Sequence, residues 1–372
     1  MFFFLSLVGS QVFVFLPVAH LTKKKEPFKK RAHYSLSQRT KMNCSSPVST
    51  AVQWYTIMQC ARINFYLIPA ALLTTSTLLL NSLLLFCILR NSSLRQETRY
   101  LLLGNTFLAD ALFLLINLVK VSSNALDIEI PYICCQAIIF TTVTTFCSSV
   151  QTVTLMVIDT FAAVRWPLHY NKILPHSRII KIIGFVWAFN ALVSMVLLLV
   201  TELSNDSRPE SLKVCVVLIA LACVKQLQFV LQVYYNGWVV VCSVLVVYCY
   251  IRLYNVTKSS GIWSSRYSRA RQTLLVHSLM LVMYFAPCLV FTVQLAKFDR
   301  LNKDVNVWLN TMNLTVLMLL PRACSPYLYG LRNRKIYDTV KLMLWLYVYL
   351  TYKSYLSAQN HTQIFFLTQN SY

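Results

Sequence analysis

Long apolar runs alternate along the chain with short polar segments. A transmembrane helix needs about 20 consecutive, mostly apolar residues. Seven runs reach that length, at residues 63–89, 99–123, 134–164, 178–201, 229–254, 273–297 and 305–331. The pattern predicts an all-α membrane protein built as a seven-transmembrane helix bundle, with an extracellular segment (1–62) before it and a cytoplasmic tail (345–372) after it.

A different pattern follows the last run, in "RNRKIYDTVKLML" (332–344). One helical face carries apolar side chains and the other carries charged ones (Ile336, Val340, Met343 and Leu344 against Arg334, Lys335, Asp338 and Lys341). This arrangement is typical of an amphipathic helix lying on a membrane surface. We therefore expect a short eighth helix, which completes a domain spanning residues 63–344.

Composition supports a membrane location and gives the orientation. Only 12% of the residues are charged, about half the share found in soluble domains, so lipid must surround much of the chain. The net charge is +22, but Lys and Arg fall in short clusters between apolar runs. The positive-inside rule predicts such clusters in cytoplasmic loops, so we expect no nucleic-acid partner. Their distribution predicts a multi-pass plasma-membrane protein with its N-terminus outside and its C-terminus in the cytoplasm.

The first 41 residues leave three interpretations open. The apolar start "MFFFLSLVGSQVFVFLPVA" precedes "KKKEPFKKR" and lacks the basic start of a signal peptide. It is a cleaved signal, an extracellular tail, or a stretch absent from the mature protein. Met42 could serve as a second start, which favours the third interpretation. Acceptor sequons for N-glycosylation begin at Asn43 and Asn205.

Several functional classes lack their usual motifs. The six glycines are scattered, so no glycine-rich loop can hold a nucleotide phosphate. No CxxC or HExxH spacing occurs, and we expect neither a resident metal nor an enzyme. A transporter is the competing membrane class, but the two halves of the chain show no repetition.

Asp110, in "LGNTFLADALF", is the sharpest candidate for function because it lies in the middle of an apolar run. It is either a protonated acid bonded to a neighbouring helix or a carboxylate in a polar cluster that holds water or a sodium ion. Asn81, Ser149 and Ser325 are its candidate partners. Arg322, deep in the seventh run, also requires a partner, which the sequence does not identify.

Prolines and cysteines mark further features. Pro287, Pro321 and Pro326 interrupt the sixth and seventh runs, where a proline kinks a helix and allows two packings. Cysteines flank the outer ends of the third and fifth runs, which permits a disulfide there (Cys134, Cys135, Cys215 and Cys223). Spacing to the next helix slightly favours Cys223 over Cys215.

Diagnostic residues in nearly every run resemble the rhodopsin-like G-protein-coupled receptors. They are Asn81, "LADA" around Asp110, Cys135, Trp187, "YFAP" ending at Pro287, and "SPYLY" (325–329). The stretches "AVRWPLHY" and "SPYLYGLRNRKI" are similar to the olfactory-receptor branch. The match covers residues 63–344. It implies that an extracellular ligand shifts the helix packing and that a heterotrimeric G protein binds at the inner face.

The resemblance also implies roles for single residues. Asp110, Ser149 and Ser325 would form the sodium and water cluster, and Phe285 would stand above the kink at Pro287. Tyr329 would be the inner tyrosine that moves on activation. Cys135 would be the third-helix half of the outer disulfide.

Three residues depart from the family pattern. Thr160 replaces the arginine that follows Asp159, Ser325 replaces an asparagine, and Phe285 replaces a tryptophan. Asp159 has therefore lost its partner and must pair with Arg165 or an inner-loop base, or face water. We expect weak or atypical G-protein coupling, and a non-signalling decoy or scavenger receptor is the alternative.

The ligand is constrained by what the pocket-lining runs contain. Thr142 lies about five turns outward from Thr160, at the level where amine receptors carry an acid, so a biogenic amine is not expected. The seventh run has no lysine that could hold retinal. Apolar and hydroxyl-bearing walls predict a small neutral, lipid-like or odorant ligand.

Overall fold

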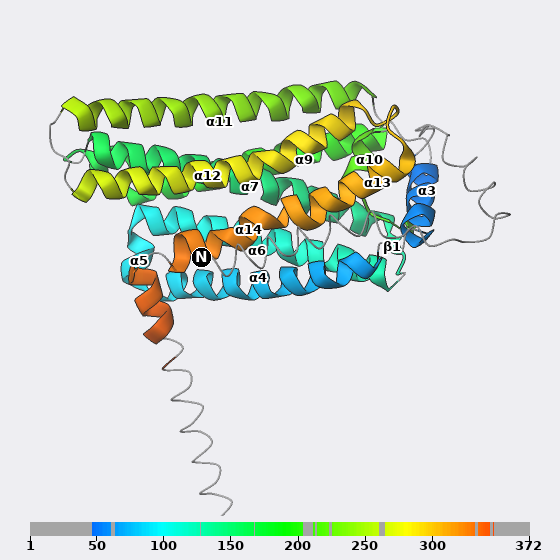
Figure 1. The fold of residues 1–372 in the computed structure, drawn as a ribbon, viewed down its shortest axis with the longest axis horizontal. Helices are drawn as coiled ribbons and strands as arrows, with labels where there is room; N and C mark the ends of the chain where they lie inside the picture. Colours follow the sequence, from blue (N-terminus) through cyan, green and yellow to red (C-terminus); the bar gives the residue numbers. More distant parts are fainter. Residues whose placement is uncertain are drawn as a thin grey trace, which may run out of the picture.

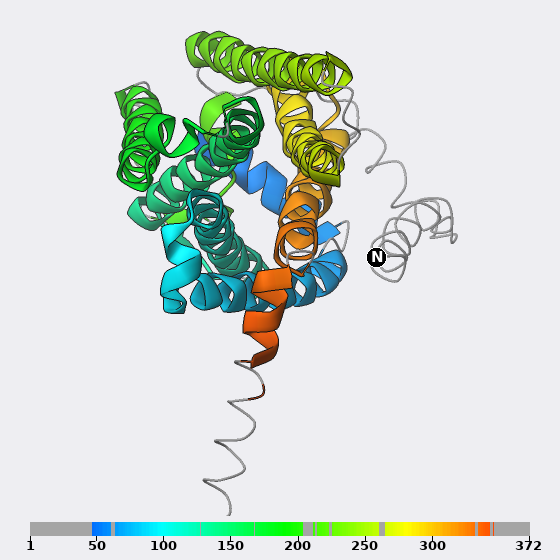
Figure 2. The same ribbon diagram turned by 90° about the vertical axis from the view of Figure 1, so that its left-hand side faces the viewer.

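The computed structural model describes residues 47–60, 64–126, 128–166, 168–203, 211–212, 214–222, 225–259, 265–331, 334–342 and 345. Six long helices lie side by side (Figure 1) and, together with the segments of the seventh run, form a ring when viewed end-on (Figure 2). They are α4 (Asn64–Arg90), α6 (Thr98–Ala125), α7 (Tyr132–Arg165), α9 (His176–Leu203), α11 (Lys225–Ser259) and α12 (Ser265–Ala296). Each contains the apolar run that predicted it, or nearly all of that run. All six are long and apolar enough to cross a membrane.

The seventh run forms consecutive helical segments rather than one uniform helix. These are α13 (Lys303–Met312), the π-helix η1 (Asn313–Leu317), α14 (Leu319–Ser325) and the π-helix η2 (Pro326–Leu331). Pro321 and Pro326 lack an amide hydrogen, which disturbs regular α-helical bonding. Single π turns inside helices often mark functional sites. The predicted seven-helix bundle is confirmed, with its last helix segmented.

Short elements distinguish the two ends of the bundle. At one end lie α5 (Ser92–Gln96) and α8 (Tyr170–Ile173), next to Asp159, and we call it the Asp159 end. At the other lie α3 (Pro47–Cys60), α10 (Val217–Ala222) and the antiparallel pair β1 (Ile130–Pro131) and β2 (Ser211–Leu212). This second end carries the disulfide described below, and we call it the disulfide end.

The helix α3 was not predicted, and it covers part of the disulfide end. It lies across the bundle axis (Figure 1) and is visible through the ring of helices in Figure 2. It contacts α10 and α13. Trp54 is fully buried and stacks on Phe298, with ring centroids 6.5 Å apart. The packing of this aromatic pair fixes α3 against the bundle.

Residues 334–342 are helical and amphipathic, as predicted. Ile336 and Val340 are buried, whereas the charged side chains are exposed. Lys335 Nζ lies 2.7 Å from Glu97 Oε1, and this contact raises the pKa of the lysine. The pair joins the helix to the polypeptide between α5 and α6. The predicted positions Met343 and Leu344 lie outside the described residues.

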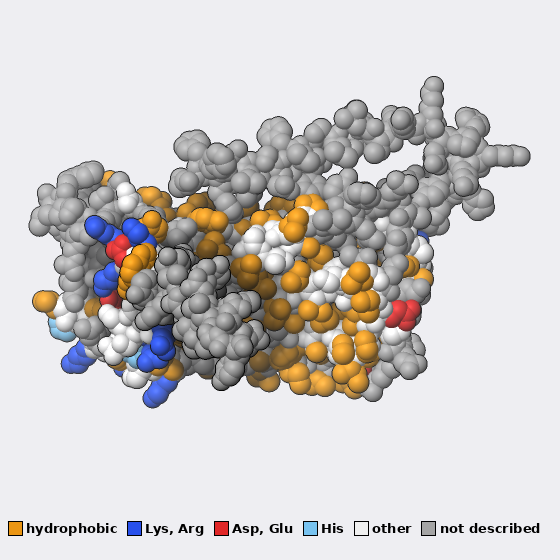
Figure 3. Space-filling view, turned by 90° about the horizontal axis from the view of Figure 1, so that it is seen from below, with side chains coloured by type: hydrophobic (Ala, Val, Ile, Leu, Met, Phe, Trp, Pro, Cys, Tyr) orange, Lys and Arg blue, Asp and Glu red, His pale blue; other side chains and the backbone are white. Residues whose placement is uncertain are grey.

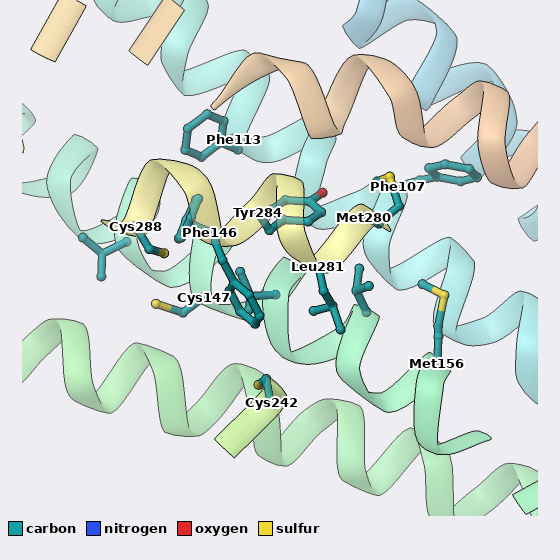
Figure 4. Packing of buried hydrophobic residues seen from close by; sticks show 14 of the residues in the cluster. Phe107, Phe113, Phe146, Cys147, Met156, Cys242, Met280, Leu281, Tyr284 and Cys288 are labelled. Atoms are coloured by element: carbon teal, nitrogen blue, oxygen red, sulfur yellow. The ribbon is translucent and has the colours of Figure 1, made fainter. Parts of the chain in front are cut away.

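Side-chain chemistry varies along the bundle. On the face in Figure 3, hydrophobic side chains cover the middle, and Lys and Arg gather at the Asp159 end. Inside, aromatic residues of three helices pack together (Figure 4). The ring centroid of Phe146 lies 6.4 Å from that of Phe113 and 6.4 Å from that of Tyr284. The buried Cys147, Cys242 and Cys288 are small packing residues of the same cluster.

Candidate functional site

A polar cluster surrounds Asp110 at the middle of α6. The carboxylate is completely buried and accepts hydrogen bonds from three helices. Ser149 Oγ of α7 lies 3.0 Å from Oδ1, and Ser325 Oγ of α14 lies 3.4 Å from Oδ2. The Tyr284 hydroxyl of α12 lies 2.8 Å from Oδ1 and 2.9 Å from Oδ2. Asp110 therefore links four helices.

Asn81 extends the cluster to α4. Its Nδ2 donates to the carbonyl oxygens of Thr77 at 2.9 Å and Arg322 at 3.4 Å. Ser325 Oγ lies 3.5 Å from Asn81 Oδ1. Asp110 and the three residues that the sequence grouped around it thus lie together, and the role of this cluster stays a prediction.

Arg322, whose partner the sequence did not identify, lies inside the same cluster. Its Nε is 3.5 Å from Asp110 Oδ1, and neither side chain is exposed. Nη1 donates to the carbonyl oxygen of Met318 at 2.5 Å. The guanidinium carbon lies 3.5 Å from the ring centre of Phe113 and 5.4 Å from that of Tyr284. Stacking on aromatic faces favours a buried cation through the ring quadrupole.

This arrangement does not fit the sodium ion that the resemblance implies. Arg322 already supplies the positive charge beside the Asp110 carboxylate. A sodium ion bound to the same carboxylate would be repelled by the guanidinium of Arg322, because charges interact strongly in a poorly screened interior. The described residues contain no group of three or more Cys, His, Asp or Glu that could hold a metal.

Tyr284 is the member of the cluster that was not predicted from the sequence. A hydroxyl in an otherwise apolar span is a signal, because a buried tyrosine usually bonds through its polar tip. The adjacent Phe285 faces elsewhere, lining a small space with Phe146 and Trp238. The carbonyl oxygen of Pro287 accepts a hydrogen bond from Asn313 Nδ2 at 3.3 Å. Pro326 begins η2, and the switch roles of Phe285 and both prolines stay predictions.

At the Asp159 end, the acid without its family arginine bonds to a tyrosine. The Tyr170 hydroxyl, on α8, donates to Asp159 Oδ1 at 2.5 Å. Burial raises the pKa of Tyr170, the hydrogen bond to Asp159 raises it further, and Arg99 lowers it. The hydroxyl therefore stays protonated at neutral pH and acts as the donor.

The suggested pairing of Asp159 with Arg165 is wrong. Arg165 is exposed and its guanidinium lies 6.0 Å from the ring centre of Trp166. Six residues separate the two positions on α7, which places them about 120° apart around the helix axis. Arg165 therefore makes no ion pair with the carboxylate, whereas Tyr170 of α8 bonds to it. A G-protein-facing role for Arg165 stays a prediction.

A cavity of about 480 Å³ opens at the Asp159 end. Its lining includes Arg99, Asp159, Thr160, His277, Tyr329 and Arg334. Tyr329 Oη lies 3.0 Å from His277 Nδ1, which joins η2 to α12. Thr160 Oγ1 donates to the carbonyl oxygen of Met156 in its own helix at 2.9 Å. The threonine therefore gives Asp159 no charged partner.

Replacing Tyr170 by phenylalanine tests the new partner of Asp159. We expect the free energy of unfolding to fall by about 1.5–3 kcal/mol, because the buried carboxylate loses a hydrogen bond. Thermal unfolding of the purified protein in detergent measures the change. The control is Tyr254→Phe, which alters an exposed side chain on α11. Equal stability of the two variants would contradict the role given to Tyr170.

At the disulfide end, Cys135 is bonded to Cys215, with Cα atoms 5.6 Å apart. The slight preference for Cys223 is therefore wrong. Pairing of β1 with β2 sets Ile130 opposite Leu212 and brings Cys215 to the first turn of α7. The helix α10 occupies the following residues, so distance along the chain to α11 was a poor guide.

The disulfide forms part of the wall of a second cavity, of about 50 Å³. Thr142, the predicted pocket residue, lies in this wall with Phe146, Tyr235 and Phe291. Lys120 of α6 also lines it, although the side chain is only 6% exposed. Lys120 was not predicted from the sequence, because it lies within an otherwise apolar run. The two glycosylation acceptors, Asn43 and Asn205, lie outside the described residues.

Comparison with known proteins agrees with this architecture. The family model described as 7 transmembrane receptor (rhodopsin family) matches residues 80–329. The chain therefore belongs to the rhodopsin family of seven-transmembrane receptors, and it is a multi-pass membrane protein.

Three relatives place it among olfactory-like members. It is 30% identical to human "Probable G-protein coupled receptor 148" over 279 residues, which cover 74% of this chain and 80% of the relative. From the sequence alone, the stretches "SSGIWSSRYSRARQTLLVHS" and "LPRACSPYLYGLR" resemble this relative. It is 23% identical to Odorant receptor 131-2 of Danio rerio (74% and 85% covered) and 25% identical to human Olfactory receptor 4L1 (52% and 61%).

Proposed function

We propose that this receptor relays the binding of an extracellular ligand to a heterotrimeric G protein, with atypical coupling. The main support is the pair of cavities at opposite ends of one bundle, with the cluster at Asp110 between them. The cavity at the Asp159 end has a volume of about 480 Å³ and is lined by Arg99 and Arg334, and we assign it to a segment of the G protein. The relative named "Probable G-protein coupled receptor 148" favours the same activity.

The orientation follows from charge. Lys and Arg gather at the Asp159 end (Figure 3), and basic clusters favour the cytoplasmic side. The disulfide at the other end suits an oxidising exterior. We therefore place the N-terminus outside the plasma membrane, the C-terminus in the cytoplasm, and the G protein at the Asp159 end.

The switch at this end differs from a carboxylate–arginine pair. A neutral hydroxyl, Tyr170, holds Asp159 and ties α8 to α7. A hydrogen bond to a charged group contributes about 1.5–3 kcal/mol, so the tie stabilises one packing of this end. Activation requires the hydrogen bond between Tyr170 and Asp159 to break. Position 160 then offers no arginine to contact the G protein. Coupling that depends on other basic residues follows from this geometry.

The middle of the bundle also differs from the family pattern. Arg322 occupies the neighbourhood of Asp110 that a sodium ion would otherwise take. The inactive packing is then stabilised by an internal ion pair between α6 and α14. On this basis the receptor responds to its ligand without regulation by sodium.

Introducing the family arginine at position 160 tests the altered switch. Thr160→Arg places a guanidinium beside Asp159 and competes with Tyr170 for the carboxylate. We expect higher agonist-independent or G-protein signalling, measured by nucleotide exchange in membranes with several purified G proteins. The rate of ligand-independent nucleotide exchange should rise by about tenfold. This corresponds to a change of about 1.4 kcal/mol in the free-energy difference between the two packings. Thr160→Lys is the control for charge alone.

The same assay separates the remaining classes. No change with Thr160→Arg in any readout would contradict the switch. Absence of exchange with every G protein, despite ligand binding at the surface, would favour a decoy or scavenger receptor. Ion flux or solute uptake in receptor-containing vesicles would favour a transporter.

A further inference from the structure

The cavity at the disulfide end is lined by a buried cation, Lys120, that no acidic residue of the described part of the chain balances. Among the described residues, the buried charged side chains are Asp110, Lys120, Asp159 and Arg322. Asp110 pairs with Arg322, and Asp159 is held by Tyr170 at the far end. Lys120 is left without a carboxylate of the described residues within 4 Å of its Nζ. Burial of an unpaired ion is costly, and such residues in a membrane bundle are functional by default.

The surroundings of Lys120 define what would balance it. The cavity wall is mainly apolar, with Phe113, Phe146, Tyr235 and Phe291 among its residues. Lys120 is ten residues beyond Asp110 on α6, which places it about 15 Å closer to the disulfide end. It therefore provides a positive charge inside an apolar chamber near the proposed entrance.

Asn313 supplies a second unsatisfied group in the same chamber. Its side chain is 1% exposed, and its Oδ1 has no hydrogen-bond partner within the described structure. Its Nδ2 is already occupied by the carbonyl oxygen of Pro287. A buried acceptor without a donor is unfavourable, so a ligand hydroxyl or amide hydrogen would stabilise it.

We propose that the ligand is a small organic acid whose carboxylate pairs with Lys120 and whose short apolar body fills the aromatic chamber. The cavity is small, about 50 Å³ against about 480 Å³ at the Asp159 end, which favours a short body over a lipid chain. A hydroxyl on that body would reach Asn313. This inference rests on the proposed ligand entry at the disulfide end and replaces the neutral ligand expected from the sequence with an anionic one.

Matched acids and amides test the charge requirement. The probes are isovalerate, benzoate and 3-hydroxybutyrate, each beside its neutral amide, added to the purified full-length receptor in detergent. We expect at least one acid to raise the melting temperature in a dose-dependent manner, and its amide to have no effect. The proposal is overturned if an amide stabilises as well as its acid, or if none of the acids stabilises.

Variants at Lys120 test the proposed ion pair with the ligand carboxylate. Lys120→Met should weaken acid binding by about thirtyfold or more, because a buried charge partner is removed. Lys120→Arg should retain binding, and Lys297→Met, which changes an exposed lysine near the same end, should leave it unchanged. Equal acid binding by wild type and Lys120→Met would overturn the assignment.

The ligand-free receptor provides a second readout. Lys120→Met should raise its melting temperature by about 2–4 °C, because the uncompensated charge is gone. A lower melting temperature would mean that Lys120 supports the fold, which overturns the inference. Binding of an acid without nucleotide exchange would contradict only the proposed coupling to a G protein. Nucleotide exchange driven solely by neutral ligands would contradict only the proposal that the ligand is an acid.

Discussion

Replacing Arg322 by methionine is expected to lower the free energy of unfolding by about 3–5 kcal/mol. The substitution removes the cation beside Asp110 and leaves a carboxylate at the centre of the bundle with no exposed surface. It also removes the stacking of the guanidinium on Phe113. Thermal unfolding in detergent and the amount of receptor at the cell surface measure the loss.

The double variant identifies the cause of that loss. Asp110→Asn combined with Arg322→Met replaces the ion pair by neutral groups of similar size, so most of the lost stability should return. Arg334→Met is the matched control, because Arg334 pairs with Asp338 at 3.8 Å on an exposed surface. Exposed pairs contribute little. Additive losses in the double variant would refute the pairing of Asp110 with Arg322.

Salt dependence provides an independent readout of the same pair. In wild type we expect equal melting temperatures in sodium chloride and choline chloride at one ionic strength. In Arg322→Met the carboxylate is free to bind a small cation with Ser149 and Ser325, so sodium should restore part of the stability. A sodium response already present in wild type would show that Arg322 does not take the place of the ion.

The long elements followed from sequence because their physical cause is local. Apolar runs of sufficient length can satisfy their backbone in a membrane only as helices or barrels. The bounds of α6 and α9 therefore lie within a few residues of the predicted runs. The segmentation of the seventh helix was harder to predict. Pro321 and Pro326 indicate that the helix is disturbed, but they do not specify π turns.

Side-chain partners were harder to predict because they depend on distant elements. Asp110 and Arg322 were both recognised as buried charges, but 212 positions separate them in the sequence and no spacing rule joins them. Tyr170 lies only eleven positions from Asp159. Even so, its role depends on α8 returning toward α7, a turn that apolar periodicity does not describe. Lys120 was missed because one cation within a span changes its hydropathy little.

Breaking the disulfide is the second change with a large expected effect. The Cys135–Cys215 bond closes a loop with a sequence separation of 80 that contains the fourth helix, α9. Removing a native disulfide typically costs about 2–5 kcal/mol, because the unfolded chain regains freedom. Cys215→Ser should therefore lower the melting temperature and the surface level of the receptor. Cys135→Ser should have the same effect, and the double variant should be no worse than either single variant.

Cys223→Ser is the discriminating control, since the competing assignment places the bond there. It should leave both stability and surface level unchanged. Loss with Cys223→Ser and none with Cys215→Ser would contradict the assignment.

The cavity gives the disulfide a consequence beyond stability. Cys215, Val216 and Leu218 all line the cavity that contains Lys120. Without the bond, the segment bearing them is no longer fixed to α7, so the cavity wall loses its preorganised shape. Ligand affinity should then fall even at a temperature where the Cys215→Ser receptor remains folded, because binding must restore that order. A folded Cys215→Ser receptor with wild-type affinity would show that β1 and β2 hold the wall without the covalent bond.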